Sequence, residues 1–134
     1  MNVLVTGGAG FIGSHVSEAF LARGDRVWVL DDLSSGKREN VPAGAELVVS
    51  NVEDPGVRDL FRDVHFELVS HHAAQIDVRV SVSDPALDAR INVLGLLNLT
   101  EAALEAGTAR NSTVCLRAVE VYLSKTHDLL RSRK

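Results

Sequence analysis

Short apolar runs rich in β-branched residues alternate along the chain with segments whose apolar residues have helical spacing. The runs that predict strands are Asn2–Thr6, Arg26–Leu30, Glu46–Ser50, Glu67–Ser70 and the apolar segment Thr113–Val121. The segments that predict helices are Phe11–Arg23, Asp54–Val64 and Leu87–Ala106. Because strands and helices alternate, right-handed crossovers predict a doubly wound parallel α/β sheet of about five strands in the order 3-2-1-4-5.

Three other segments give weaker signals. Leu33–Ala45 is polar and carries two glycines and a proline, so we expect mostly loop. Ile76–Ser83 has alternating valines, which suit either a strand or a loop. Tyr122–Arg131 is weakly helical. In the Asp54–Val64 helix, Asp54 is the expected N-cap and the proline after it the first helical residue.

Composition favours a single globular domain over residues 1–134. Hydrophobic residues make up 46% of the chain but aromatic residues only 4%, so we expect a core of aliphatic side chains, as in buried parallel sheets. The formal net charge is −4 and no basic patch dominates, which argues against a nucleic-acid partner.

The sequence also indicates a cytoplasmic protein. Its one cysteine, Cys115, cannot form an internal disulfide and is expected to be a small core residue. The N-terminus lacks the features of a secretory signal, and no apolar run is long enough to cross a membrane.

The strongest motif is the glycine-rich stretch TGGAGFIG, from Thr6 to Gly13, between the first strand and the first helix. Gly7 allows a sharp turn out of the strand, Gly10 allows a pyrophosphate to approach the backbone, and Gly13 allows the helix to lie tightly on the sheet. Such a turn alone is often purely structural. Here a strand precedes it and a helix follows it, so the motif predicts a Rossmann-type dinucleotide site at the helix N-terminus.

Asp31, at the end of the second strand, predicts which dinucleotide binds. It follows Gly13 at roughly the 20 residues expected of a ribose-binding acid. A carboxylate accepts the ribose hydroxyls of NAD and repels the 2′-phosphate of NADP, so we expect NAD as the cofactor. Lys37 and Arg38 follow closely, and we interpret them as a solvated pair rather than a phosphate site.

Four motifs together resemble a known family. TGGAGFIG, LDDLSSGKREN, HHAAQ and INVLGLLNLTEAA occur in the order found in the N-terminal half of extended short-chain dehydrogenases/reductases. The chain is most similar to the NAD-dependent nucleotide-sugar epimerases and dehydratases. The resemblance is strongest over residues 1–107, while residues 108–134 diverge, so we expect a truncated member that retains the cofactor half.

The resemblance implies a set of contacts with NAD. The pyrophosphate would contact the glycine-rich turn and the helix start, and the adenosine ribose would lie at the end of the second strand. Asn51 stands where the family has an acid that contacts the adenine amino group. The full set of implied cofactor-binding residues is Gly7, Gly10, Phe11, Ile12, Gly13, Asp31, Asp32, Leu33, Asn51, Val52, His72, Ala73, Ala74, Gln75 and Asn92.

The resemblance does not extend to the catalytic groups. The family uses a serine or threonine after the fifth strand and a Tyr-x-x-x-Lys helix, whereas this chain has Arg117 and Ala118 at the former position. Tyr122 and Lys125 are three residues apart rather than four, and nothing in the sequence supplies a sugar pocket beside them. We therefore predict no catalytic residue. We also predict no metal site, since His71 and His72 are adjacent in a strand and point to opposite faces.

Three functions follow from this pattern. The leading prediction is an NAD(H)-binding domain without turnover of its own, with a nucleotide sugar as a partner only by resemblance. The alternatives are a UDP-sugar 4-epimerase completed by another chain, and an interaction module that has lost the cofactor. An exposed fifth strand would be an edge strand with unpaired backbone N–H and C=O groups, which tend to pair with another chain. We therefore also predict a homodimer through that strand or the C-terminal segment.

Overall fold

A parallel sheet of five strands forms the centre of the computed structural model, which describes residues 1–108 and 114–116. The strands are β1 (Asn2–Thr6), β2 (Arg26–Asp31), β3 (Glu46–Val49), β4 (Leu68–His71) and β5 (Val114–Leu116). They lie in the order β3-β2-β1-β4-β5. The predicted fold class, strand number and strand order are therefore confirmed.

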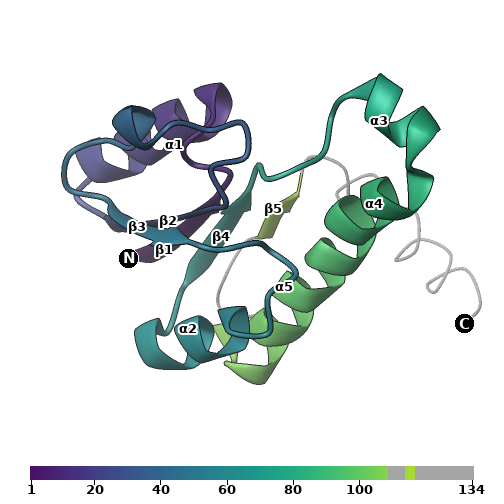
Figure 1. Ribbon diagram of the computed structural model, residues 1–134. Helices are drawn as coiled ribbons and strands as arrows, with labels where there is room; N and C mark the ends of the chain where they lie inside the picture. The colour runs from purple at the N-terminus through teal and green to yellow at the C-terminus, as the bar shows by residue number, and fades with distance from the viewer. Residues whose placement is uncertain (109–113, 117–134) are drawn as a thin grey trace, which may run out of the picture.

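Helices cover the two faces of this sheet (Figure 1). Helix α1 (Phe11–Ala22) lies on one face, and α2 (Val57–Val64) and α5 (Gly95–Glu105) lie together on the other. Two short helices, α3 (Val78–Ser83) and α4 (Pro85–Ala89), project beyond the carboxyl end of β4. Because the strands are parallel, the carboxyl ends of β1, β2 and β4 lie together at one edge of the sheet.

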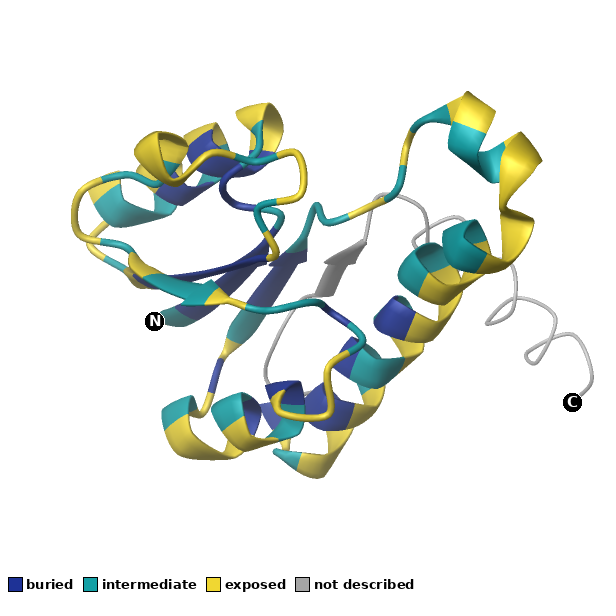
Figure 2. Ribbon diagram, viewed as in Figure 1, coloured by how far each residue is buried: buried dark blue, intermediate teal, exposed yellow. Residues whose placement is uncertain are grey.

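Alternate residues of each central strand pack into different halves of the core. Val3 and Val5 of β1 face α1, while Leu4 between them faces α2 and α5. The half that faces α2 and α5 contains the buried aromatic residues, with Phe61 fully buried and its ring 5.2 Å from that of Phe66. Dark blue buried segments accordingly concentrate along β1 and β2 in Figure 2.

The inner face of α1 differs from the pattern that predicted this helix. Its buried residues are Gly13, Ser14 and Ser17, all small, whereas Phe11 and Ile12 are exposed. Small residues let the helix lie close to the sheet, and each buried hydroxyl donates to a backbone carbonyl of the same helix. The apolar residues at the helix start therefore face outward, toward a cleft at the carboxyl ends of the strands.

Two local predictions require correction. Ile76–Ser83 contains helix α3 rather than a strand, because Asp77 caps this segment: its Oδ1 accepts the N–H of Arg79 at 2.9 Å. Helix α2 begins at Val57, three residues after the predicted N-cap. Asp54 instead accepts the N–H of Gly56 at 2.8 Å and forms a turn ahead of the helix.

The predicted long helix begins earlier and changes its hydrogen-bonding pattern within its length. Asp84 accepts the N–H of Leu87 at 3.0 Å, so the helix starts at Pro85 as α4. A π-helical turn, Arg90–Leu94, then joins α4 to α5. A π-turn holds one more residue than an α-turn and rotates the residues that follow it.

Several predictions concern residues that the structure does not describe. These are Thr113, Arg117–Val121, and the C-terminal segment that contains Tyr122, Lys125 and Arg131. The side chain of Cys115 also lies outside the described part. Among the helices of residues 1–108, none combines the length and the apolar character that crossing a bilayer requires.

Candidate dinucleotide-binding site

The glycine-rich turn leaves β1 through a backbone conformation that only glycine adopts freely. Gly7 has φ +67°, and a Cβ at this position would lie 2.6 Å from the backbone nitrogen of Ala73. The turn is closed by the N–H of Gly10, which donates to the carbonyl of Gly7 at 3.1 Å. A Cβ on Gly13 would lie 2.2 Å from that same carbonyl oxygen. The turn and the helix are thus in direct backbone contact.

Helix α1 starts immediately after this turn and presents its N-terminus to a cleft. Its N-cap is Gly10, which has no side chain to accept the free N–H groups of the first turn. A cleft of about 610 Å³ opens at this point, lined by Gly7, Gly10, Phe11, Ile12 and Gly13 on the side of α1. An uncapped helix N-terminus that faces a cleft is a favourable position for the negative charge of a pyrophosphate.

Asp31 lies at the end of β2, on the wall of the cleft next to the turn. Its side chain is buried, and its two oxygens accept backbone N–H groups from either side: Oδ2 from Ala9 and Oδ1 from Leu33, both at 2.9 Å. Leu33 has a positive φ of 60°, a backbone conformation that is uncommon for residues other than glycine. Each carboxylate oxygen retains a further acceptor position, so Asp31 can also accept ribose hydroxyls.

Asp32 and Asn51 meet across the ends of β2 and β3. The Asn51 amide donates to Asp32 Oδ2 at 3.4 Å, and its oxygen accepts the N–H of Glu53 at 3.1 Å. An aspartate at position 51 would place a second carboxylate against Asp32. The neutral amide removes that repulsion and still presents an acceptor, and Val52 continues this wall of the cleft.

The histidines at the end of β4 have separate hydrogen-bond partners. His71 Nδ1 lies 2.5 Å from Thr6 Oγ1, and His72 Nε2 lies 2.8 Å from Ser70 Oγ. Burial lowers the pKa of His71 to about 4, and the neighbouring His72 adds to this effect. Within residues 1–108 and 114–116, no group of three or more His, Cys, Asp or Glu side chains is placed to hold a metal ion.

The segment after β4 forms the opposite wall of the cleft. His72, Ala73, Ala74 and Gln75 all line it. Asn92, from the π-helical turn, holds this segment through two bonds of 2.9 Å: its Oδ1 accepts the N–H of Gln75, and its Nδ2 donates to the Gln75 carbonyl.

The structure therefore brings nearly all of the predicted site residues to one cleft. Leu33 and Asn92 do not line it, and they act instead through Asp31 and Gln75. Sequence reasoning missed other lining residues: Leu30, Ser34, Ser35, Gly36, Ser50, Ile76, Asp77 and Ile91. The dipeptide Ser-Ser followed by glycine in LDDLSSGKREN was the available signal, because small residues suit a wall that approaches a ligand closely.

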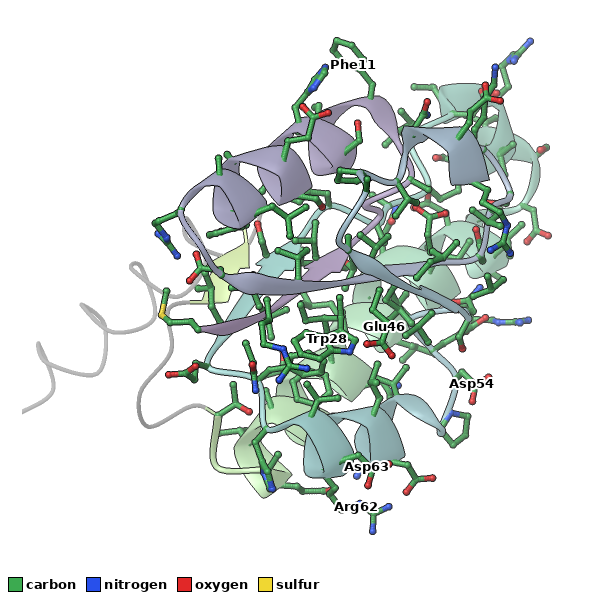
Figure 3. The ribbon with its side chains drawn as sticks, turned by 90° about the vertical axis from the view of Figure 1, so that its left-hand side faces the viewer. Phe11, Trp28, Glu46, Asp54, Arg62 and Asp63 are labelled. Atoms are coloured by element: carbon green, nitrogen blue, oxygen red, sulfur yellow. The ribbon has the colours of Figure 1, made fainter. Side chains whose placement is uncertain are left out.

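Figure 3 shows how the two sides of the molecule differ. Trp28 lies between the sheet and α2, and its ring packs edge-on against Phe66 at 5.5 Å between centroids. Phe11 projects from the start of α1 on the other side of the sheet and is 79% exposed. The aromatic core is thus separate from the cleft, and Phe11 is free to contact a ligand at its rim.

Comparison with known proteins shows that the chain is similar to UDP-glucose 4-epimerases, among other sugar epimerases. A putative UDP-glucose 4-epimerase from Methanocaldococcus jannaschii is 44% identical over 102 residues, covering 74% of this chain and 32% of the relative. The UDP-glucose 4-epimerase of Mycolicibacterium smegmatis is 44% identical over 115 residues, covering 82% of this chain and 37% of its own length. The chain therefore spans about a third of the length of these curated relatives.

Solved structures agree with the sequence relatives. The UDP-glucose 4-epimerase of Thermus thermophilus, solved as a complex with NAD, matches with a TM-score of 0.77 and 55% identity over 81% of this chain and 35% of that one. The enzyme of Thermotoga maritima, solved with UDP-glucose, gives a TM-score of 0.78 at 45% identity, over 80% of this chain and 35% of that one.

A family model also matches nearly the whole chain, over residues 3–130. It describes the NAD dependent epimerase/dehydratase family, so both the predicted resemblance and NAD as the family's cofactor are confirmed. Together with the glycine-rich turn, the acid after β2 and the uncapped helix facing a cleft, the match shows that this chain belongs to the NAD dependent epimerase/dehydratase family.

Proposed function

We propose that this chain is the NAD(H)-binding part of a nucleotide-sugar epimerase or dehydratase. In this proposal the pyrophosphate lies against Gly10 and the start of α1, and the adenosine ribose contacts Asp31. The adenine lies near Asn51 and Val52, and the nicotinamide half extends along residues 72–75. The observation that carries the proposal is the uncapped N-terminus of α1, which opens into a cleft with a buried acid at its edge.

Calorimetric titration with NAD and NADP tests the cofactor. Asp31 and Asp32 stand together at the ribose end, and two carboxylates there disfavour a 2′-phosphate. We expect NAD to bind about tenfold or more tightly than NADP, which corresponds to ~1.4 kcal/mol. Equal or tighter binding of NADP would contradict the role given to these acids.

Gly10→Val tests where the phosphates lie. A Cβ at Gly10 would meet only the Gly7 carbonyl oxygen, at 3.2 Å, so the backbone needs to shift by only a few tenths of an ångström there, whereas the valine side chain would fill the space proposed for the pyrophosphate. Gly56→Val is a matched control, since a Cβ there also meets one oxygen, at 3.2 Å, but Gly56 does not line the cleft. We expect loss of NAD binding in Gly10→Val alone. Normal binding in that variant would place the phosphates elsewhere.

The two other candidate functions give different results in simple assays. An epimerase completed by another chain is supported by the names and greater length of the relatives. That function requires conversion of a UDP-sugar when NAD is added to the protein with its partner. An interaction module without cofactor would show no change of melting temperature with NAD, whereas a binder is stabilised as ligand concentration exceeds Kd.

We also propose a cytoplasmic homodimer. The single cysteine suits a reducing compartment. Within the described residues, β5 is the last strand of the sheet, and edge strands tend to pair with a second chain. Light scattering at micromolar concentration tests the dimer, and a stable monomer would contradict it.

A further inference from the structure

The middle of the glycine-rich turn is held by the loop that follows β2. Ala9 is fully buried, and its N–H donates to Asp31. Its carbonyl oxygen accepts two further bonds, from the backbone N–H of Lys37 at 3.0 Å and from the side-chain amide of Asn40 at 2.9 Å. One peptide group that flanks Ala9 is therefore tied to the last residue of β2, and the other is tied to the segment after β2.

This segment also packs tightly against the turn. A Cβ on Gly36 would lie 2.9 Å from both Ala9 Cβ and Asp31 Oδ1. Asn40 closes the segment at the end of the 3₁₀ turn Arg38–Asn40. Its own N–H donates to the Lys37 carbonyl at 2.9 Å, which fixes the backbone from which its side chain reaches Ala9.

We propose that Asn40 is a positioning residue for the phosphate-binding turn. The carbonyl that Asn40 holds belongs to the same peptide group as the Gly10 N–H, and this N–H donates to Gly7. Fixing both ends of that peptide sets the direction of the backbone at the N-cap, and hence where the free N–H groups of α1 point. The residue thus acts on the pyrophosphate without touching it, and this role rests on the proposed function.

The test compares three variants in binding and in amide exchange. Asn40→Ala removes the bond, and Asn40→Asp keeps the shape of the side chain but turns an acceptor toward the Ala9 carbonyl. Glu39→Ala is the matched control, because Glu39 is exposed and forms only a long surface ion pair with the Lys37 ammonium, at 3.7 Å among the described residues. Titrations with NAD, ADP-ribose and adenosine measure binding, and hydrogen exchange by NMR measures the Gly10 amide without ligand.

We expect both Asn40 variants to bind NAD and ADP-ribose about three- to tenfold more weakly, as the loss of one hydrogen bond implies. Adenosine affinity should stay the same, because adenosine has no phosphate. The Gly10 amide should exchange faster while amides of β1 keep their rates, a pattern that general destabilisation would not give. Glu39→Ala should match the wild type in every measurement.

Other outcomes overturn the inference. One is that Asn40→Asp keeps both its NAD affinity and its Gly10 exchange rate within about twofold of the wild type. The other is that the variants lose affinity for adenosine and for NAD to the same extent. If Asn40→Ala fails to fold, Asn40→Asp decides the question. If the wild type does not bind NAD, the proposed function fails, and the exchange rates still decide whether Asn40 holds the turn.

Discussion

Acidification should destabilise this fold in a pH range set by His71. Thr6 Oγ1 accepts the N–H groups of His72 and Ala73, both at 3.2 Å, which uses its two acceptor positions. Its own hydrogen must therefore point to His71 Nδ1, so the neutral ring carries its proton on Nε2. Protonation of Nδ1 would turn this acceptor into a donor and break the bond.

The size of the effect follows from the pKa. Because the pKa of His71 is about 4 in the folded protein and 6.5 ordinarily, the unfolded chain binds more protons between these values. Stability is therefore complete above about pH 6.5 and falls as the pH falls toward 4, by at most ~3 kcal/mol. At pH 4.5 the expected loss is about 2–3 kcal/mol, a large part of the roughly 5–15 kcal/mol typical of domains.

Urea unfolding at pH 7 and pH 4.5 measures this loss. A change of about 2–3 kcal/mol lowers the midpoint by roughly 1–3 M urea. Asp25 and Asp77 have pKa values lowered from 3.8 by hydrogen bonds, so their contributions are lost only at more acidic pH. His71→Gln removes the titrating ring and should flatten the dependence between pH 4.5 and 7, while His15→Gln, at an exposed position, should not.

Two results would contradict this role of His71: equal stability of the wild type at both pH values, or a loss of stability in His71→Gln as large as that of the wild type. The first result would mean that His71 is protonated without cost. The second would assign the loss to other groups.

Three further predictions address packing and the site. Phe61→Ala should lower the free energy of unfolding by about 3–5 kcal/mol, because Phe61 is fully buried, and calorimetry or denaturant titration measures it. Gly13→Ala should destabilise the protein and weaken NAD binding, since its Cβ would overlap the Gly7 carbonyl oxygen, and thermal melts with and without NAD separate the two effects. Asp31→Asn should weaken NAD binding about tenfold or more, because its amide would face the N–H of Ala9 or Leu33 with a donor, and calorimetric titration checks this.

The fold was predictable because its signals are local and repeated. Strands β1 and β2 are short apolar runs, and the handedness of the crossovers then leaves few ways to order five parallel strands. The turn at Gly7 was predictable for the same reason, since its positive φ and close contacts require glycine in one short stretch. Burial within α1 was not predictable from apolar spacing, because the sheet contacts its small residues and leaves Phe11 for the cleft.

Residues that act across long sequence separations escaped the sequence analysis. Asn40 is the last residue of the motif LDDLSSGKREN, but nothing in that motif indicates its contact with Ala9. Helix α3 was missed because alternating valines suit a strand, while the cap from Asp77 and the exposure of Val78 and Val82 show that no sheet accepts them. The apolar pattern of a segment gives its periodicity, but the residues that it contacts elsewhere in the fold decide whether it forms a strand or a helix.

The wall after β4 shows how a side chain can replace a missing strand. The N–H of His72 makes the last backbone bond to β1, to the Thr6 carbonyl at 3.0 Å, and the residues after it leave the sheet and lose the backbone partners that a strand would supply. Asn92 presents an acceptor and a donor in one plane and satisfies both backbone groups of Gln75, as a neighbouring strand would. That match depends on the π-helical turn Arg90–Leu94, which adds a residue and changes the direction of the side chains around it. The position of this wall therefore depends on the π-helical turn. The apolar spacing of Leu87–Ala106 predicts an uninterrupted α-helix and does not indicate this turn.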